Sequence, residues 1–167
     1  MSRRNTRPDI RPFAFGWTSG TFRAGLWSKT WSLWMLYYLV PLLTGWLLKL
    51  VFDALETSES INRLLLAIGM AEAIRWALFG SAIFFVVRWW LAAITLFRTN
   101  MLEAQTVSGG PKAATLPGSP AEAITRFTDD ARDGVLWPDS WVDGSGVVLF
   151  GVGALIVMAT IDARAAL

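Results

Sequence analysis

Three long apolar runs, separated by polar segments, dominate the sequence. They cover about residues 30–52, 64–97 and 144–161. A helix needs roughly 18 to 20 apolar residues to cross a hydrocarbon core about 30 Å thick, and each run meets this length. The polar connection 53–63 is short, which favours an antiparallel return of the second helix. The pattern therefore predicts an all-α membrane protein with three transmembrane helices.

The second run is too long for one crossing and too short for two crossings joined by a turn. We predict a single helix whose membrane part, residues 64–87, continues beyond the membrane to residue 97. Arg88, Trp89 and Trp90 mark the expected inner interface, because long cationic side chains and aromatic rings anchor helices at that depth. The second helix should therefore extend into the cytoplasm.

The first run contains one charged residue and one proline. Lys49 is close enough to the end of the run for its side chain to reach the membrane interface. Pro41 removes one backbone hydrogen bond and predicts a tolerated kink, and a pivot in a moving helix is the alternative interpretation.

The third run is uncharged and rich in glycine. Small residues let membrane helices approach closely. The spacing contains no GxxxG pair, so we predict close packing without a specific dimer motif. The glycines are Gly144, Gly146, Gly151 and Gly153.

Residues 1–29 are basic and aromatic, with Asp9 as their one acidic residue. Basic residues ahead of a transmembrane helix favour the cytoplasmic side. The aromatic residues among them predict an interfacial helix rather than a nucleic-acid-binding segment. The formal net charge of +2 also gives no reason to expect nucleic acid as a partner. We therefore predict a multi-pass protein of a bacterial plasma (inner) membrane, in contact with membrane lipid, with a cytoplasmic N-terminus.

A polar segment, residues 98–143, separates the second and third runs and lies in the cytoplasm if the N-terminus does. Its Ser119 to Glu122 stretch is typical of a helix start, with serine as the cap, Pro120 in the first helical position and glutamate three residues after the serine. Pro138 predicts a break before the third run. Apolar residues at spacings of three and four predict one apolar helix face. They are Ala123, Ile124, Phe127, Ala131 and Val135.

Two opposite charges fall within the second span. Glu72 and Arg75 are three residues apart, so they share a helix face and can form an ion pair. Ionised pairs inside a membrane usually face the bundle interior or a water-filled cavity. Two interpretations stay open: a structural pair, or part of the lining of a substrate translocation path.

Composition and spacing exclude several kinds of chemistry. Without Cys or His, the chain has no thiol nucleophile, no iron–sulfur ligand and no histidine base or metal ligand. Lys112 follows Pro111 rather than glycine, so the segment around it is not a P-loop. Asp129, Asp130 and Asp133 are candidate metal ligands by type, but a hard-cation site needs about six oxygens and a shaping loop, so we expect them to form a solvated helix face. We expect no catalytic residue, metal or cofactor site, and therefore no enzyme.

Residues 119–133, SPAEAITRFTDDARD, resemble the first intracellular loop of ABC exporter transmembrane domains. In that family a motif with serine, glutamate, arginine and aspartate at fixed spacing leads from the coupling helix into the third membrane helix. Ala121 stands where the family usually has glycine. The first run and the end of the third run also resemble the family, so the resemblance covers about residues 20–167. The matching motif residues are Ser119, Pro120, Glu122, Ala123, Ile124, Arg126, Phe127 and Asp130.

The resemblance implies a six-helix transmembrane domain with long cytoplasmic helical extensions, of which residues 30–167 would form the N-terminal part. In the family, the coupling helix docks on a nucleotide-binding domain, and ATP-driven closure of that domain rocks the membrane helices. The implied partners are a nucleotide-binding domain, a second transporter half in a homo- or heterodimer, and a transported substrate. The implied coupling residues are Gly118, Ser119, Pro120, Glu122 and Arg126.

The sequence lacks the nucleotide-binding motifs of that family. It contains no Walker A, Walker B or signature sequence, so ATP and Mg²⁺ would bind the nucleotide-binding domain and not this chain. The expected function is therefore that of a transmembrane segment of an ABC exporter. The alternative is a small stand-alone integral membrane protein that binds or regulates a partner.

Overall fold

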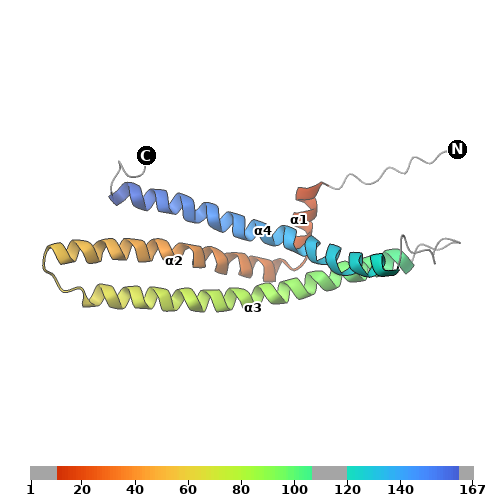
Figure 1. Cartoon of the computed structure of the whole chain (residues 1–167), viewed down its shortest axis with the longest axis horizontal. Coiled ribbons are helices and arrows are strands. Elements are labelled where there is room, and N and C mark those ends of the chain that lie inside the picture. Colours follow the sequence, from red (N-terminus) through yellow and green to blue (C-terminus); the bar gives the residue numbers. More distant parts are fainter. Residues whose placement is uncertain (1–10, 107–119, 162–167) are drawn as a thin grey trace. The chain divides into compact units, whose positions relative to one another are not determined.

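The computed structural model describes residues 11–106 and 120–161, and these residues form four helices with short connections. Figure 1 shows α1 (Pro12–Thr21), α2 (Ala24–Glu56), α3 (Asn62–Thr106) and α4 (Pro120–Ile161). The predicted all-α architecture is confirmed for this part of the chain. Three of the helices, α2, α3 and α4, are long and apolar enough to cross a membrane.

The helices extend beyond the apolar runs that predict them. Helix α2 begins and ends outside the predicted range 30–52. Helix α3 is one unbroken helix, as predicted, but it continues beyond residue 97 to Thr106, the last described residue before the gap. Its last turns contain methionine, leucine, glutamate and alanine, which are good helix formers even where no apolar run continues. Helix α1 lies within residues 1–29, where a helix was expected.

The predicted break at Pro138 is wrong. Helix α4 continues through Pro138, whose side chain is fully buried. A proline in a helix removes one backbone hydrogen bond, but ending the helix there would leave several backbone groups unpaired. Losing one backbone hydrogen bond costs less than ending the helix. Residues 120–143 of the polar segment are therefore helical throughout.

The C-terminus of α2 is closed by its own backbone. The N–H of Glu59 donates to the carbonyl of Ala54 at 2.9 Å, and the N–H of Ser58 donates to that of Leu55 at 3.3 Å. Ser58 has a φ of 58°, so it occupies the left-handed position that ends many helices. This pair of hydrogen bonds satisfies carbonyls that the end of a helix would otherwise leave free.

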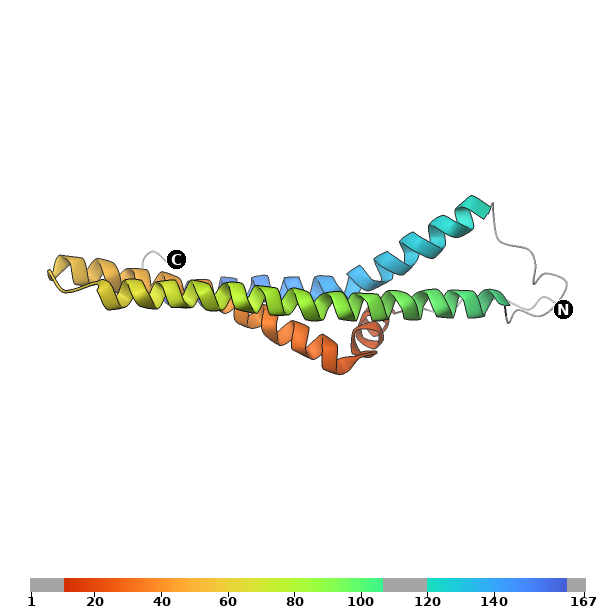
Figure 2. The same cartoon turned by 90° about the horizontal axis from the view of Figure 1, so that it is seen from below.

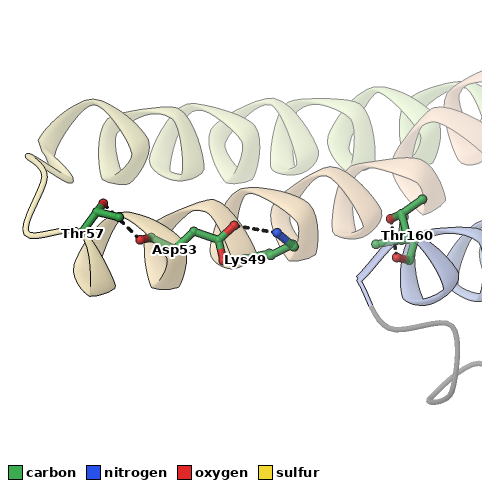
Figure 3. A network of polar contacts seen from close by, with 5 residues as sticks. Lys49, Asp53, Thr57 and Thr160 are labelled. Atoms are coloured by element: carbon green, nitrogen blue, oxygen red, sulfur yellow. Dashed lines mark hydrogen bonds and ion pairs between the residues drawn. The ribbon is translucent and has the colours of Figure 1, made fainter.

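One turn earlier, Lys49 forms an ion pair with Asp53. Figure 3 shows Lys49 Nζ pointing along α2 toward the carboxylate of Asp53, at 2.6 Å. Thr57 Oγ1 donates to the backbone carbonyl of Asp53 at 3.3 Å. The charge of Lys49 is thus directed to the polar end of α2, as expected for a cation near the end of an apolar run.

The described residues pack as two compact units. The first unit contains residues 11–24, 90–106 and 120–139, and the second contains residues 25–89 and 140–161. Helices α3 and α4 each contribute to both units. Each unit has its own set of helix contacts.

In the first unit, α1 is held by aromatic contacts. Phe15 of α1 stacks on Phe97 of α3 with ring centroids 5.7 Å apart. Both rings lie beside Gly134 of α4, where an added Cβ would be 3.4 Å from Phe97. The indole Nε1 of Trp137 donates to the carbonyl of Pro12 at 3.2 Å. Helix α1 therefore packs against both α3 and α4.

The apolar face predicted for the start of α4 is only partly buried. Ala131 and Val135 are buried in the first unit. Ile124, on the same predicted apolar face, is 67% exposed. Further along α4, Arg98 of α3 lies over the Phe127 ring, 5.8 Å from its centre.

In the second unit, α2 and α3 run antiparallel and side by side, as the short connection predicts (Figures 1 and 2). The core of this unit combines small and branched residues with two tryptophans. Small side chains on α3 let the neighbouring helix approach closely. The buried apolar residues are Trp27, Leu47, Val51 and Ala54 of α2, Ala71, Ala82, Val86 and Trp89 of α3, and Val142 of α4.

Two of the four glycines in the third run face α2 in this unit. A Cβ added at Gly146 would overlap the ring of Tyr38, and one added at Gly153 would overlap the Leu42 side chain. A Cβ at Gly144 or Gly151 would meet nothing within 4 Å. The predicted close packing therefore involves one face of α4, which Gly146 and Gly153 share at a spacing of two helical turns.

Most of the apolar surface of the long helices is not covered by this chain. In the most apolar stretches of α2, α3 and α4, only 6%, 22% and 11% of residues are buried. Trp76 and Leu66 are among the large side chains that are more than half exposed. A water-soluble chain would not leave so much apolar surface uncovered. These helices indicate a multi-pass membrane protein.

Candidate functional site

Glu72 and Arg75 lie on one face of α3 and both contact α2. Arg75 Nη1 is 3.4 Å from Glu72 Oε2, and Thr44 of α2 donates from Oγ1 to Glu72 Oε1 at 3.0 Å. Arg75 Nη2 donates to the Tyr37 hydroxyl at 3.4 Å, and the guanidinium lies 5.0 Å from the centre of the Tyr37 ring. The two charges named from the sequence are thus part of one polar cluster inside the second unit.

In this cluster, the carboxylate of Glu72 has better hydrogen-bond partners than the guanidinium of Arg75. Both oxygens of Glu72 have partners, one of them the short contact with Thr44. Both contacts of the Arg75 Nη atoms are 3.4 Å long, which is longer than a typical N–H···O bond of about 2.9 Å. Arg75 Nε is buried and has no hydrogen-bond partner among the described residues. The guanidinium therefore retains hydrogen-bonding capacity.

A cavity of about 450 Å³ adjoins this cluster. It lies entirely within the second unit and is lined by residues of three helices. Five of its lining residues are aromatic, and Arg75 is the charged member of the described lining. The lining consists of Trp34, Tyr37, Tyr38 and Pro41 of α2, Arg75 and Phe79 of α3, and Phe150 of α4.

The aromatic rings around the cavity form a connected cluster. Trp34 meets Tyr37 edge-on at 5.4 Å and Phe79 edge-on at 5.9 Å. Tyr37 and Tyr38 meet edge-on at 5.7 Å. Edge-on contacts at these distances are favourable geometries for aromatic pairs. The rings hold one another in place, so the cavity wall is preorganised.

Sequence reasoning identified the charges of this site but not its aromatic wall. The spacing of Trp34, Tyr37, Tyr38 and Pro41 is that of one helix face, which is a signal the sequence does contain. Phe150 gives no such signal. It joins the cavity only because α4 packs on α2 in the second unit.

The residues implied for coupling are described only in part. Gly118 and Ser119 lie outside the described residues. Pro120 is the first described residue of α4, and Glu122 and Arg126 follow within the first two described turns of that helix. The described part of α4 therefore includes residues 120–133 of the segment that carries the resemblance.

A second, smaller cavity of about 300 Å³ lies in the first unit. Arg98 and Arg132 line it together with Asp129 and apolar residues of α3 and α4. Asp129, Asp130 and Asp133 are exposed, as expected for a solvated helix face. The two arginines share this cavity with a carboxylate, which lowers its attraction for anions.

No protein-family model, curated protein or solved structure matches this chain.

Proposed function

We propose that this chain is a transmembrane segment of an ATP-driven ABC exporter. In this proposal, α2, α3 and α4 cross the plasma membrane from a cytoplasmic N-terminus and form part of the substrate translocation path. The segment 118–125 transmits force from a nucleotide-binding domain. That domain binds ATP and Mg²⁺, and a second transporter half, identical or different, completes the path.

One observation carries the proposal. The residues that resemble the exporter loop follow α3 in the chain, and from Pro120 onward they form the beginning of α4, which continues into the third apolar run. A continuous helix from a cytoplasmic contact to the membrane is what force transmission requires, because a helix is stiff along its axis and a loop is not. The extension of α3 to Thr106 supplies a second such helix.

Photocrosslinking from two positions tests this proposal. Replacing Glu122 with benzoylphenylalanine places the crosslinker at the proposed docking segment, and replacing Ser58 places it in the connection between α2 and α3 as a matched control. We expect the Glu122 variant, in membranes of its own host, to crosslink to a polypeptide that contains a Walker A sequence, identified by mass spectrometry. The Ser58 variant should give no such product.

Two results would contradict the proposal. One is equal crosslinking from both positions, which would show that the contact is not specific to the loop. The other is a Glu122 adduct exclusively with a protein that has no nucleotide-binding motif. That second result would favour a small stand-alone membrane protein with a different partner.

A further inference from the structure

The cavity of the second unit has the composition of a ligand site. Its volume of about 450 Å³ falls within the range of roughly 300–1,000 Å³ that is typical of small-molecule pockets. Such pockets combine an apolar, mainly aromatic wall with a few polar groups that fix the orientation of the ligand. Here the aromatic wall includes Trp34 of α2, Phe79 of α3 and Phe150 of α4. A flat apolar body would be favoured, because rings stack on rings.

Arg75 is the group that would orient a ligand. Its Nε is buried without a hydrogen-bond partner among the described residues, and its Nη contacts are both long. In apolar surroundings weakly held donors are costly, and a charge-assisted hydrogen bond that an Arg75 Nη atom donates to an acidic ligand would remove that cost. Glu72 does not line the cavity, and its Oε1 is held by Thr44. The cavity therefore presents a guanidinium whose carboxylate partner, Glu72, is 3.4 Å from Nη1 but does not belong to the lining.

The position of Arg75 within the membrane limits which molecules can bring an acidic group to it. Arg75 lies midway between Arg63 and Arg88 on α3, about 18–20 Å along the helix from each. If the helix crosses the membrane, Arg75 is near the middle of the hydrocarbon core, beyond the reach of a phospholipid headgroup at either surface. The acidic group must therefore belong to a molecule whose apolar body enters the cavity with it.

We infer that this cavity binds an amphiphilic monoanion, with a flat aromatic body among the rings and its acidic group against the guanidinium of Arg75. As the assignment of a transported substrate class, this inference rests on the proposed function. As the assignment of a binding site, it depends only on the contacts of the second unit.

Two pyrene probes that differ in charge test the inference. The full chain is reconstituted in phosphatidylcholine vesicles, and pyrenebutyrate or pyrenebutanol is titrated while energy transfer from tryptophan to pyrene is measured against protein-free vesicles. We expect saturable binding, with the anionic probe bound at least about tenfold more tightly than the alcohol, since one charge-assisted hydrogen bond accounts for that ratio. Oleate, which has the acid without the rings, should displace the probe only weakly.

Three variants locate the site. Arg75→Gln should abolish the preference for the anion, and Arg75→Lys, which keeps the charge, should retain part of it. Arg88→Gln is the matched control, because Arg88 lies on the same helix, stacks on Phe84 at 4.0 Å and does not line the cavity. Circular dichroism verifies that each variant keeps its helical content. If Arg75→Gln does not fold, Phe150→Ala takes its place and should weaken both probes by severalfold.

The inference is overturned by equal affinity for both probes, by equal loss in Arg75→Gln and Arg88→Gln, or by displacement by oleate as effective as that by pyrenebutyrate itself. Any of these results leaves the crosslinking experiment at position 122 unaffected. A failed binding test therefore removes the assigned site without removing the exporter proposal. Conversely, specific anion binding combined with failed crosslinking would retain the site and reject the exporter.

Discussion

Glu72→Leu should destabilise the protein more than the double substitution Glu72→Leu/Arg75→Leu does. The single variant leaves the guanidinium of Arg75 inside an apolar span without its carboxylate partner. Removing one partner of a fully buried pair costs about 3–5 kcal/mol, whereas replacing both partners with apolar residues is often neutral. Because both side chains are about one third exposed, at 33% and 36%, we expect a smaller loss of about 2 kcal/mol for the single variant.

Unfolding in detergent, followed by circular dichroism with increasing sodium dodecyl sulfate, measures both variants. The double variant should fall within about 1 kcal/mol of the parent protein, because no unpaired charge remains. Glu59→Leu serves as the control, since Glu59 is exposed in the connection between α2 and α3. A double variant as unstable as Glu72→Leu would show that the pair contributes through something other than charge compensation.

Gly146→Leu should disrupt the packing of α4 on α2, and Gly144→Leu should not. A Cβ at Gly146 already overlaps the Tyr38 ring, so a leucine there forces the ring or the helix to move. Overpacking of a close contact typically costs about 1–3 kcal/mol, and we expect the upper part of that range because the Tyr38 ring must move as one rigid group. At Gly144 the added Cβ meets nothing within 4 Å.

The same detergent unfolding assay compares these two glycine variants. The pair is well matched, because the two positions lie on the same helix and the substitution is identical. Both leucines raise helix propensity relative to glycine, so any difference between them reports packing. Equal stability of the two variants would mean that α4 does not pack on α2 through Gly146.

The sequence predicts the number and approximate position of the long helices well, because a run of apolar residues of membrane length has few other structural uses. It predicts helix ends less well. Residues 98–106 continue α3 although they form no continuous apolar run. Their helicity depends on intrinsic helix propensity, which a search for apolar runs does not detect. Pro138 was expected to end a helix, yet the neighbouring backbone bonds keep α4 continuous.

In the candidate site, too, the sequence predicts some residues and misses others. Glu72 and Arg75 stand out in the sequence because charges are rare inside apolar spans. Their partners Thr44 and Tyr37 come from another helix, and that pairing depends on the register of α2 against α3. A single sequence carries little information on such register, so the aromatic cavity becomes apparent only in the folded structure.

Cysteine accessibility tests the three-crossing topology most directly, and the chain suits it because it contains no cysteine. Ser58→Cys and Ser119→Cys each introduce one thiol, in the connection between α2 and α3 and in the segment before α4. With a membrane-impermeant maleimide, Ser58→Cys should label in intact cells, and Ser119→Cys should label only after the membrane is permeabilised. Labelling of Ser119→Cys in intact cells to the same extent as Ser58→Cys would contradict the proposed topology and, with it, docking of segment 118–125 on a cytoplasmic motor domain.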